Sequence, residues 1–249
     1  PVTCRMLLSH TSSLQDGSGY TPFLDATYSQ NPIPNISELL LASGSFYTAN
    51  MWRQESPGTY FTYSNINYGL IGTLIETLSG QRFDNFMREQ ILIPLEIDGS
   101  YNIQDLTDIN NVSVLYRYNN SWVAQWDNYQ GIMPSPPNLN DYILGSNGAY
   151  FAPQGGLRIT AQEMNIISRV FASDGAFYNL DITQENYQLM KAIAWNYNGS
   201  NGDNYDGLFN RWALGLHHAN LSVNDAICLT FSESFIGHPG EAYGLVSDN

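Results

Sequence analysis

The segment between Thr59 and Gly80 constrains the fold most, because a β-strand pattern gives way to a helix pattern within a few residues. Thr59 to Tyr63 consists of aromatic and β-branched residues, which favour an extended chain. From Asn67 the apolar residues follow the spacing of one helix face: Leu70, Ile71, Leu74, Ile75 and Leu78. Gly80 is typical of a helix C-terminus. The sequence therefore predicts an extended segment followed by an amphipathic helix that ends at Gly80.

Helix and strand patterns alternate along the rest of the chain. Thr160 and Glu163 have the spacing of a capping box, which predicts a helix from Ala161 to Phe171. Other helices are expected at residues 2–8, 38–42, 83–93 and 183–195. Extended segments are expected at residues 112–118, 122–126, 212–217, 226–231 and 242–246. The pattern is compatible with a mixed domain of helices and strands.

The charge of the chain excludes several classes of partner. Its formal net charge is -14 and its pI is near 4.3, so it repels phosphate backbones and anionic lipid surfaces. We therefore expect no nucleic-acid partner. No apolar run approaches the roughly 20 residues of a membrane helix, so no membrane span is expected. The four histidines lack the spacing of zinc ligands, and neither a metal nor a cofactor is predicted.

Two features bear on the compartment. Cys4 and Cys228 can form a disulfide in an oxidising environment, but two buried free thiols are the favoured interpretation. Asn-x-Ser/Thr sequons suit a glycosylated protein and occur at Asn35, Asn111, Asn119, Asn198 and Asn220. Because the chain is rich in Asn, Ser and Thr, several sequons are expected by chance. We expect an extracytoplasmic or secreted location.

Four short segments carry most of the functional information. The first runs from Met6 to Leu14 and reads MLLSHTSSL. The second runs from Pro57 to Tyr68 and reads PGTYFTYSNINY. The third, Gly155-Gly156-Leu157, precedes the capping box at Thr160, and the fourth is Gly237-His238-Pro239-Gly240.

In this order, the four segments resemble the β-lactamase-related serine hydrolases, the family of class C β-lactamases, penicillin-binding proteins and related esterases. The resemblance covers nearly the whole chain. It implies an α/β fold of the α+β type: an antiparallel sheet flanked by helices, with a helical lobe and a cleft between the two. It also implies that residues 1–249 form a single domain, which we expect to be incomplete at both ends.

The same resemblance implies roles for five residues. Tyr63 corresponds to the tyrosine of the family's Y-x-N motif, a base and proton shuttle. Asn65 would donate a hydrogen bond to the acyl amide or ester of the substrate and hold the catalytic lysine. His238 takes the place of the lysine in the K-T-G strand. Gly240 and Glu241 would bind substrate, with the Glu241 backbone N–H as one donor to the oxyanion.

The nucleophile of this family is absent from the 249 residues. It comes from an S-x-x-K motif, which places a lysine amine beside the serine hydroxyl on one helix face. Lys191 is the only lysine of the chain, and the residue three positions before it is Gln188. Either the motif lies upstream of Pro1 or this protein has lost it.

Two functions follow from these alternatives. The favoured one is a serine hydrolase that, when intact, cleaves an ester or amide of a small-molecule or peptide substrate through an acyl-enzyme. Histidine in place of the K-T-G lysine fits an esterase or peptidase better than a β-lactamase. The other is a non-catalytic structural or binding relative. His10 is interpreted as structural, and Trp122, Trp126 and Tyr129 as packing residues in preference to a substrate wall. The oligomeric state is not predicted.

Overall fold

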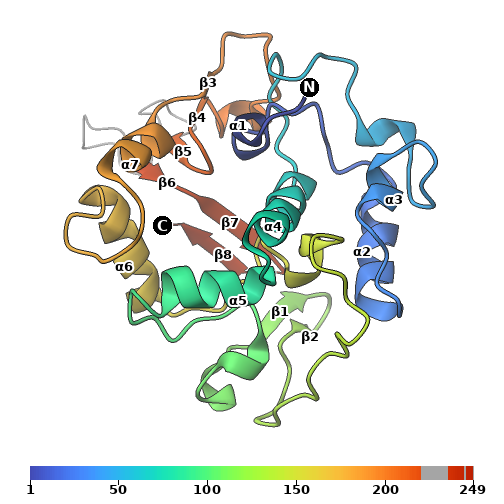
Figure 1. Cartoon of the computed structure of the whole chain (residues 1–249), viewed down its shortest axis with the longest axis vertical. Coiled ribbons are helices and arrows are strands. Elements are labelled where there is room, and N and C mark those ends of the chain that lie inside the picture. The colour runs from blue at the N-terminus through green and yellow to red at the C-terminus, as the bar shows by residue number, and fades with distance from the viewer. Residues whose placement is uncertain (220–234, 244, 249) are drawn as a thin grey trace.

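The computed structural model describes residues 1–219, 235–243 and 245–248. The helices are α1 (Cys4–Leu8), α2 (Tyr20–Ser29), α3 (Ser37–Leu40), α4 (Ile66–Ser79), α5 (Phe83–Met87), α6 (Ala161–Ala172) and α7 (Gln184–Lys191). Short 3-10 turns are η1 (Ala49–Met51), η3 (Ile103–Asp105), η4 (Ile109–Asn111), η5 (Gly148–Phe151) and η6 (Tyr205–Gly207), and η2 (Arg88–Leu92) is a π-helical turn. Helix α4 lies between α2 and α3 on one side and α6 and α7 on the other (Figure 1).

The strands are short and antiparallel. They are β1 (Leu115–Tyr118), β2 (Trp122–Trp126), β3 (Trp195–Asn196), β4 (Arg211–Trp212), β5 (His217–Ala219), β6 (Phe235–Gly237), β7 (Pro239–Ala242) and β8 (Leu245–Asp248). In the described part of the chain they form a sheet in the order β3-β4-β5-β6 and two hairpins, β1-β2 and β7-β8. Helices beside antiparallel strands are the predicted architecture. That residues 1–249 form a single domain stays a prediction.

The largest apolar cluster fills the space between α4 and the N-terminal helices. Leu7 of α1, Phe23 of α2 and Leu39 of α3 are buried in it together with Ile66 at the start of α4. Burying side chains of this size stabilises a fold by about 1.5–3 kcal/mol each. The cluster therefore fixes the N-terminal end of α4, where the Y-x-N segment lies.

Helix α4 confirms the predicted helix and its end, but not its buried face. Gly80 follows the helix in the left-handed conformation (φ 69°), as predicted. The fully buried positions, however, are small or polar: Gly69, Gly72, Thr73 and Glu76 lie there beside Ile66 and Asn67. The predicted apolar face is only partly buried, and Leu78 is 83% exposed.

The close approach of η5 explains this difference. A Cβ added to Gly148 would lie 2.3 Å from the backbone carbon of Gly72. The hydroxyl of Thr73 accepts a hydrogen bond from Gly148 N at 2.8 Å. Backbone fills this side of α4, so large apolar side chains are excluded from it. We call this contact the α4–η5 seam.

A second apolar cluster joins the segment after α5 to α6 and α7. Leu92, Leu95, Ile97, Val170 and Tyr187 are its buried members. The capping box at the start of α6 forms as predicted: Thr160 Oγ1 accepts from Glu163 N, and the Glu163 carboxylate accepts from Thr160 N.

Three predicted extended segments take another form. Within residues 59–63 only Phe61 forms a bridge, to Gly202, so this segment is not a regular strand. Residues 212–217 contain a turn at Gly215 (φ 77°), which separates β4 from β5. The predicted segment 242–246 is interrupted by a turn at Tyr243, which follows the last residue of β7. Local β preference did not reveal these turns. The segment 226–231 lies outside the described residues.

The cysteine prediction is wrong for one of the two residues. Cys4 is the first residue of α1 and is exposed, so it is not a buried thiol. It lies where α1 begins, before the chain reaches the apolar cluster around Leu7. Cys228 lies outside the described residues.

Candidate active site

The backbone on either side of Phe61 holds the Y-x-N segment in place. Phe61 N donates to Asn201 O at 3.0 Å, and Asp203 N donates to Phe61 O at 3.0 Å. Thr62 N donates to His10 O at 2.9 Å, which links the segment to the first sequence motif. Phe61 is fully buried and stacks on Trp195, with ring centroids 4.1 Å apart. Tyr63, two residues on, therefore projects from an anchored backbone.

Tyr63 lies among aromatic rings. It stacks on His10 at 4.3 Å between centroids and on Phe209 at 5.7 Å, and it packs edge-on against Trp212 at 5.8 Å. The centroid of the His238 ring is 6.0 Å away. Burial, together with the negative charge of Asp16, raises the pKa of Tyr63 to about 12. At neutral pH the phenol keeps its proton unless a cation is brought close to it.

His10 is buried under Tyr63 as a neutral ring. Its backbone is left-handed (φ 54°), and its Nδ1 accepts from Ser64 N at 3.1 Å. Asn67 Nδ2 is 3.2 Å from the same nitrogen, and Ser12 Oγ donates to Asn67 Oδ1 at 2.6 Å. Burial, and secondly the nearby His238, lowers the pKa of His10 to about 3. This hydrogen-bonded network fits the structural role expected for His10.

His238 lies at the corner between β6 and β7. Its Nδ1 is 2.7 Å from Pro239 O, and its ring packs edge-on against Trp212 at 5.3 Å. Trp212 is fully buried, and its Nε1 donates to Leu8 O at 3.3 Å. Two residues predicted for the site, Tyr63 and His238, are thus brought together around Trp212 from segments 175 positions apart in the numbering.

Gly240 and Glu241 follow His238 on β7. Gly240 pairs with Ser247 of β8, and a Cβ on Gly240 would lie 2.6 Å from the Ser247 hydroxyl. The Glu241 side chain is exposed and forms an ion pair with Arg117 of β1 at 3.3 Å. The predicted substrate role of these two residues stays a prediction.

Asn65 lies immediately before α4 and is bound by a residue that the sequence did not single out. Its Nδ2 donates to Asp16 Oδ2 at 2.7 Å, and its backbone N donates to the same oxygen at 2.9 Å. The carboxamide therefore faces the α1–α2 loop. Asp16 is 49 residues from Asn65 in the sequence, and no local spacing connects the two.

The Lys191 side chain forms its contacts in another part of the molecule. Its Nζ pairs with the carboxylate of Asp174 and donates to Phe171 O at 3.1 Å, both at the C-terminal end of α6. These contacts agree with the prediction that this lysine does not belong to the site.

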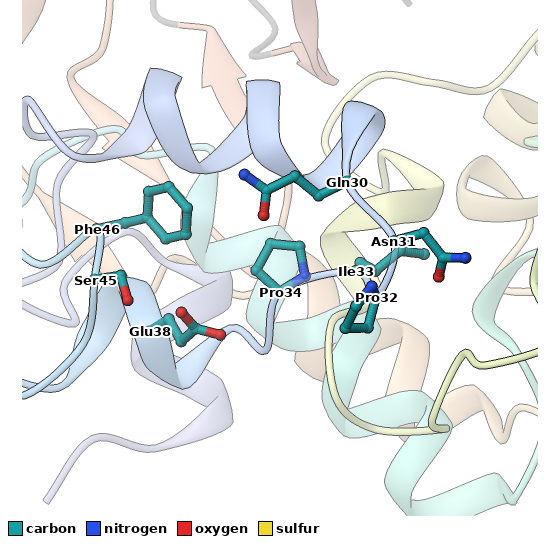
Figure 2. A pocket seen from close by; sticks show the side chains of 8 residues that line it. All are labelled: Gln30, Asn31, Pro32, Ile33, Pro34, Glu38, Ser45 and Phe46. Atoms are coloured by element: carbon teal, nitrogen blue, oxygen red, sulfur yellow. The ribbon is translucent and has the colours of Figure 1, made fainter.

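Two surface pockets lie apart from these residues. One, of about 680 Å³, is lined by the α2–α3 connection (residues 30–34), by Glu38 of α3 and by residues 45–46 after α3. Figure 2 shows Gln30 and Phe46 pointing toward one another across it. The other, of about 660 Å³, is lined by Trp52, Arg53 and their neighbours. Neither includes Tyr63 or His238.

Within the described ranges, no three His, Cys, Asp or Glu side chains come together as a group that could hold a metal ion. No helix among the residues that the structure describes is long and apolar enough to cross a bilayer.

Comparison with known proteins decides the family. The family model described as Beta-lactamase matches residues 1–247. The chain belongs to the β-lactamase family. Penicillin-binding protein 4 of Amycolatopsis lactamdurans is 24% identical over 174 residues, which are 70% of this chain and 39% of that protein.

Solved structures place the chain in the β-lactamase and penicillin-binding-protein fold. The octameric penicillin-binding protein homologue of Pyrococcus abyssi superposes with a TM-score of 0.61 at 18% identity, over 97% of this chain and 47% of that one. The D-amino acid amidase of Ochrobactrum anthropi SV3 superposes with a TM-score of 0.56 at 19% identity, over 98% of this chain and 60% of that one. The chain thus spans less than half of the length of the penicillin-binding-protein relatives named here.

Proposed function

We propose that this β-lactamase-family chain is part of a serine hydrolase that cleaves an ester or amide through an acyl-enzyme. The observation that supports this most is the juxtaposition of Tyr63 and His238, 6.0 Å apart between ring centroids, in a chain that matches the family model over residues 1–247. In the proposal, the nucleophilic serine and its lysine come from a segment outside these 249 residues.

The reaction needs a route for one proton. The serine oxygen attacks the carbonyl carbon, and its proton passes to the base network at Tyr63. When the tetrahedral adduct collapses, the C–O or C–N bond breaks and the leaving alcohol or amine takes that proton. Water then attacks the acyl-enzyme, which releases the acid and restores the serine hydroxyl. Backbone N–H groups that point at the oxyanion, with Glu241 as the candidate here, stabilise both adducts.

The raised pKa of Tyr63 places a condition on this route. A phenol whose pKa is about 12 is almost fully protonated at neutral pH, so it accepts no proton by itself. A nearby cation, such as the ammonium of the family's lysine, lowers a phenol's pKa by stabilising the phenolate. His10 does not supply that charge, because its pKa of about 3 keeps it neutral. In the proposal, Tyr63 therefore acts together with such a cation, the lysine of the segment outside these 249 residues.

Labelling the full-length protein with a fluorophosphonate tests the proposal. We expect one labelled serine, located by mass spectrometry, and hydrolysis of an activated aryl ester or of D-phenylalanine amide in preference to a penicillin. The amide is included because a D-amino acid amidase shares this fold. The absence of a labelled serine would refute the acyl-enzyme and would favour a relative that keeps the fold without the nucleophile.

Replacing Tyr63 tests the assignment of the base. Tyr63→Phe keeps the ring stack and removes the hydroxyl, and we expect turnover to fall by about a hundredfold or more, the usual scale of general acid–base catalysis. Tyr60→Phe is the matched control, because Tyr60 lies three residues away under the Arg53 guanidinium. Equal turnover in both variants would remove Tyr63 from the mechanism.

We also propose that the protein works outside the cytoplasm. Four sequon asparagines are exposed, namely Asn35, Asn111, Asn119 and Asn198, so the fold leaves them accessible for modification. Asn220 lies outside the described residues. Cell fractionation with an antibody against the chain tests this location, and recovery with a cytosolic marker alone would refute it.

A further inference from the structure

Asp16 accepts four hydrogen bonds from residues at and just before the start of α4. Its Oδ1 accepts from Ser64 Oγ at 2.9 Å and from Ile66 N at 3.1 Å. Its Oδ2 accepts from Asn65 N at 2.9 Å and from Asn65 Nδ2 at 2.7 Å. One carboxylate in the α1–α2 loop thus binds three consecutive residues, the last two of the Y-x-N motif and the first of α4.

Two of these bonds stabilise the helix, and two bind side chains. The first N–H groups of a helix lack partners within it, and a carboxylate at that end satisfies them and interacts favourably with the helix dipole. The bonds from Asn65 N and Ile66 N do this. A helix cap does not require the bonds from Ser64 Oγ and Asn65 Nδ2, so the capping role leaves half of the arrangement unexplained.

The bond to Asn65 Nδ2 determines which way the carboxamide faces. An ionised carboxylate only accepts hydrogen bonds, so the NH₂ group of Asn65, and not its carbonyl oxygen, must face Asp16. Charge-assisted bonds of this kind are stronger than neutral ones. With Nδ2 held at 2.7 Å, the Oδ1 atom is turned away from Asp16 and is left as an acceptor.

We propose that Asp16 is a positioning residue, which holds the Asn65 carboxamide so that Oδ1 accepts a hydrogen bond from the cation that carries protons in acyl transfer. This inference rests on the proposed hydrolase function. An ammonium group has three donors and no acceptor, so it can bind the carboxamide only through its oxygen, Oδ1. Asp16 touches neither substrate nor nucleophile in this role and acts through Asn65.

The negative charge of Asp16 also acts on Tyr63, and this second effect would lower the rate, whereas positioning of Asn65 would raise it. Asp16 contributes, after burial, to the raised pKa of Tyr63. If this electrostatic effect were dominant, removing the charge would make Tyr63 a better base and would increase the rate near neutral pH. If positioning is dominant, removing the charge lowers the rate. The sign of the change in Asp16→Asn therefore separates the two effects.

A double-mutant cycle in the full-length protein tests the proposal. Asp16→Asn, Asn65→Ala and the double variant are compared with wild type by kcat/KM on p-nitrophenyl acetate. Asp16→Asn offers one acceptor oxygen where the carboxylate offers two. We expect it to lower kcat/KM by about tenfold or more in the wild-type background, and by less than about twofold when Asn65 is already alanine, because its target is then gone.

Thermal unfolding separates positioning from capping. The backbone bonds from residues 65 and 66 persist in Asn65→Ala, so Asp16→Asn should lower Tm by a similar amount in both backgrounds, while only the activity loss depends on Asn65. Asp25→Asn is the matched control: it removes the same charge from an exposed position on α2 and should leave kcat/KM unchanged.

Three results would overturn the inference. An equal loss of kcat/KM in both backgrounds would show that Asp16 does not act through Asn65. An increase in rate would show that its charge on Tyr63 dominates. If no serine of the wild-type protein is labelled, the proposed function fails, and the side-chain ¹⁵N resonance of Asn65 tests the role of Asp16 by itself. A change of this resonance in Asp16→Asn supports the bond between Asp16 and the carboxamide. An unchanged resonance refutes it.

Discussion

The buried carboxylate of Glu76 connects three segments, and its removal has a predictable cost. Glu76 lies on α4 and is 1% exposed. Its Oε1 accepts from Phe83 N at 3.0 Å, and its Oε2 accepts from the Tyr142 hydroxyl at 2.6 Å and from Gly145 N at 3.0 Å. One side chain therefore ties the start of α5 and the loop before η5 to α4.

Glu76→Gln keeps the shape and replaces one acceptor oxygen by a donor. If the NH₂ group faces Phe83 N, that N–H loses its acceptor. If it faces the other way, the Tyr142 hydroxyl can rotate to accept from it, but Gly145 N is left without an acceptor. Either orientation leaves one backbone N–H unpaired, buried at Phe83 and partly buried at Gly145, at a cost of about 1–3 kcal/mol. If the 249 residues unfold as one cooperative unit, about 2 kcal/mol lowers the Tm of that unit by roughly 4–8 °C.

Thermal and urea unfolding of the full-length protein measure this loss. Glu89→Gln is the matched control, because Glu89 is exposed and bonded to Gln81, and it loses the same charge. We expect its free energy of unfolding to stay within about 0.5 kcal/mol of wild type. If Glu76→Gln and Glu89→Gln have the same Tm and the same free energy of unfolding, the reasoning about buried donors is refuted.

Two further predictions concern His10 and the α4–η5 seam. Because the pKa of His10 falls to about 3 on folding, the unfolded chain binds more protons between about pH 3 and 6.5, and the free energy of unfolding should decrease as the pH falls through this window. His10→Asn, which tolerates the left-handed backbone, should flatten that slope in urea titrations, and an unchanged slope would count against the assignment. Gly148→Ala should destabilise the protein by about 1–3 kcal/mol through overpacking, whereas Gly155→Ala, with open space around it, should not; equal unfolding curves for the two would disprove the tight contact.

The sequence predicted those parts of the fold that local chemistry determines. The capping box at Thr160 and the end of α4 at Gly80 depend on residues within one or two turns of the chain, and both formed as predicted. The buried face of α4 was predicted wrongly, because η5, some 75 residues further on, brings backbone against Gly72 and Thr73. Hydrophobic periodicity carries no information on such a contact.

The candidate site was predictable where a family motif marked it. Tyr63 and His238 were predicted from motifs, and the structure brings them together. Trp212, which packs against both rings, belongs to no such motif and was expected only to be part of a strand. Asp16 was missed because its partners start 48 residues away and because an aspartate between Gln15 and Gly17 looks like any loop residue.

The ring cluster around Tyr63 also makes the site visible by optical methods. Tyr63, Phe209, Trp212 and His238 are held at fixed and asymmetric mutual orientations, between 18° and 84° from plane to plane. Immobile aromatic rings of this kind produce near-UV circular dichroism, which disappears when specific packing is lost while helices remain. The cluster therefore contributes to the near-UV circular dichroism of the chain, alongside its other tryptophans and tyrosines, and loss of its packing should lower that signal without substrate or label.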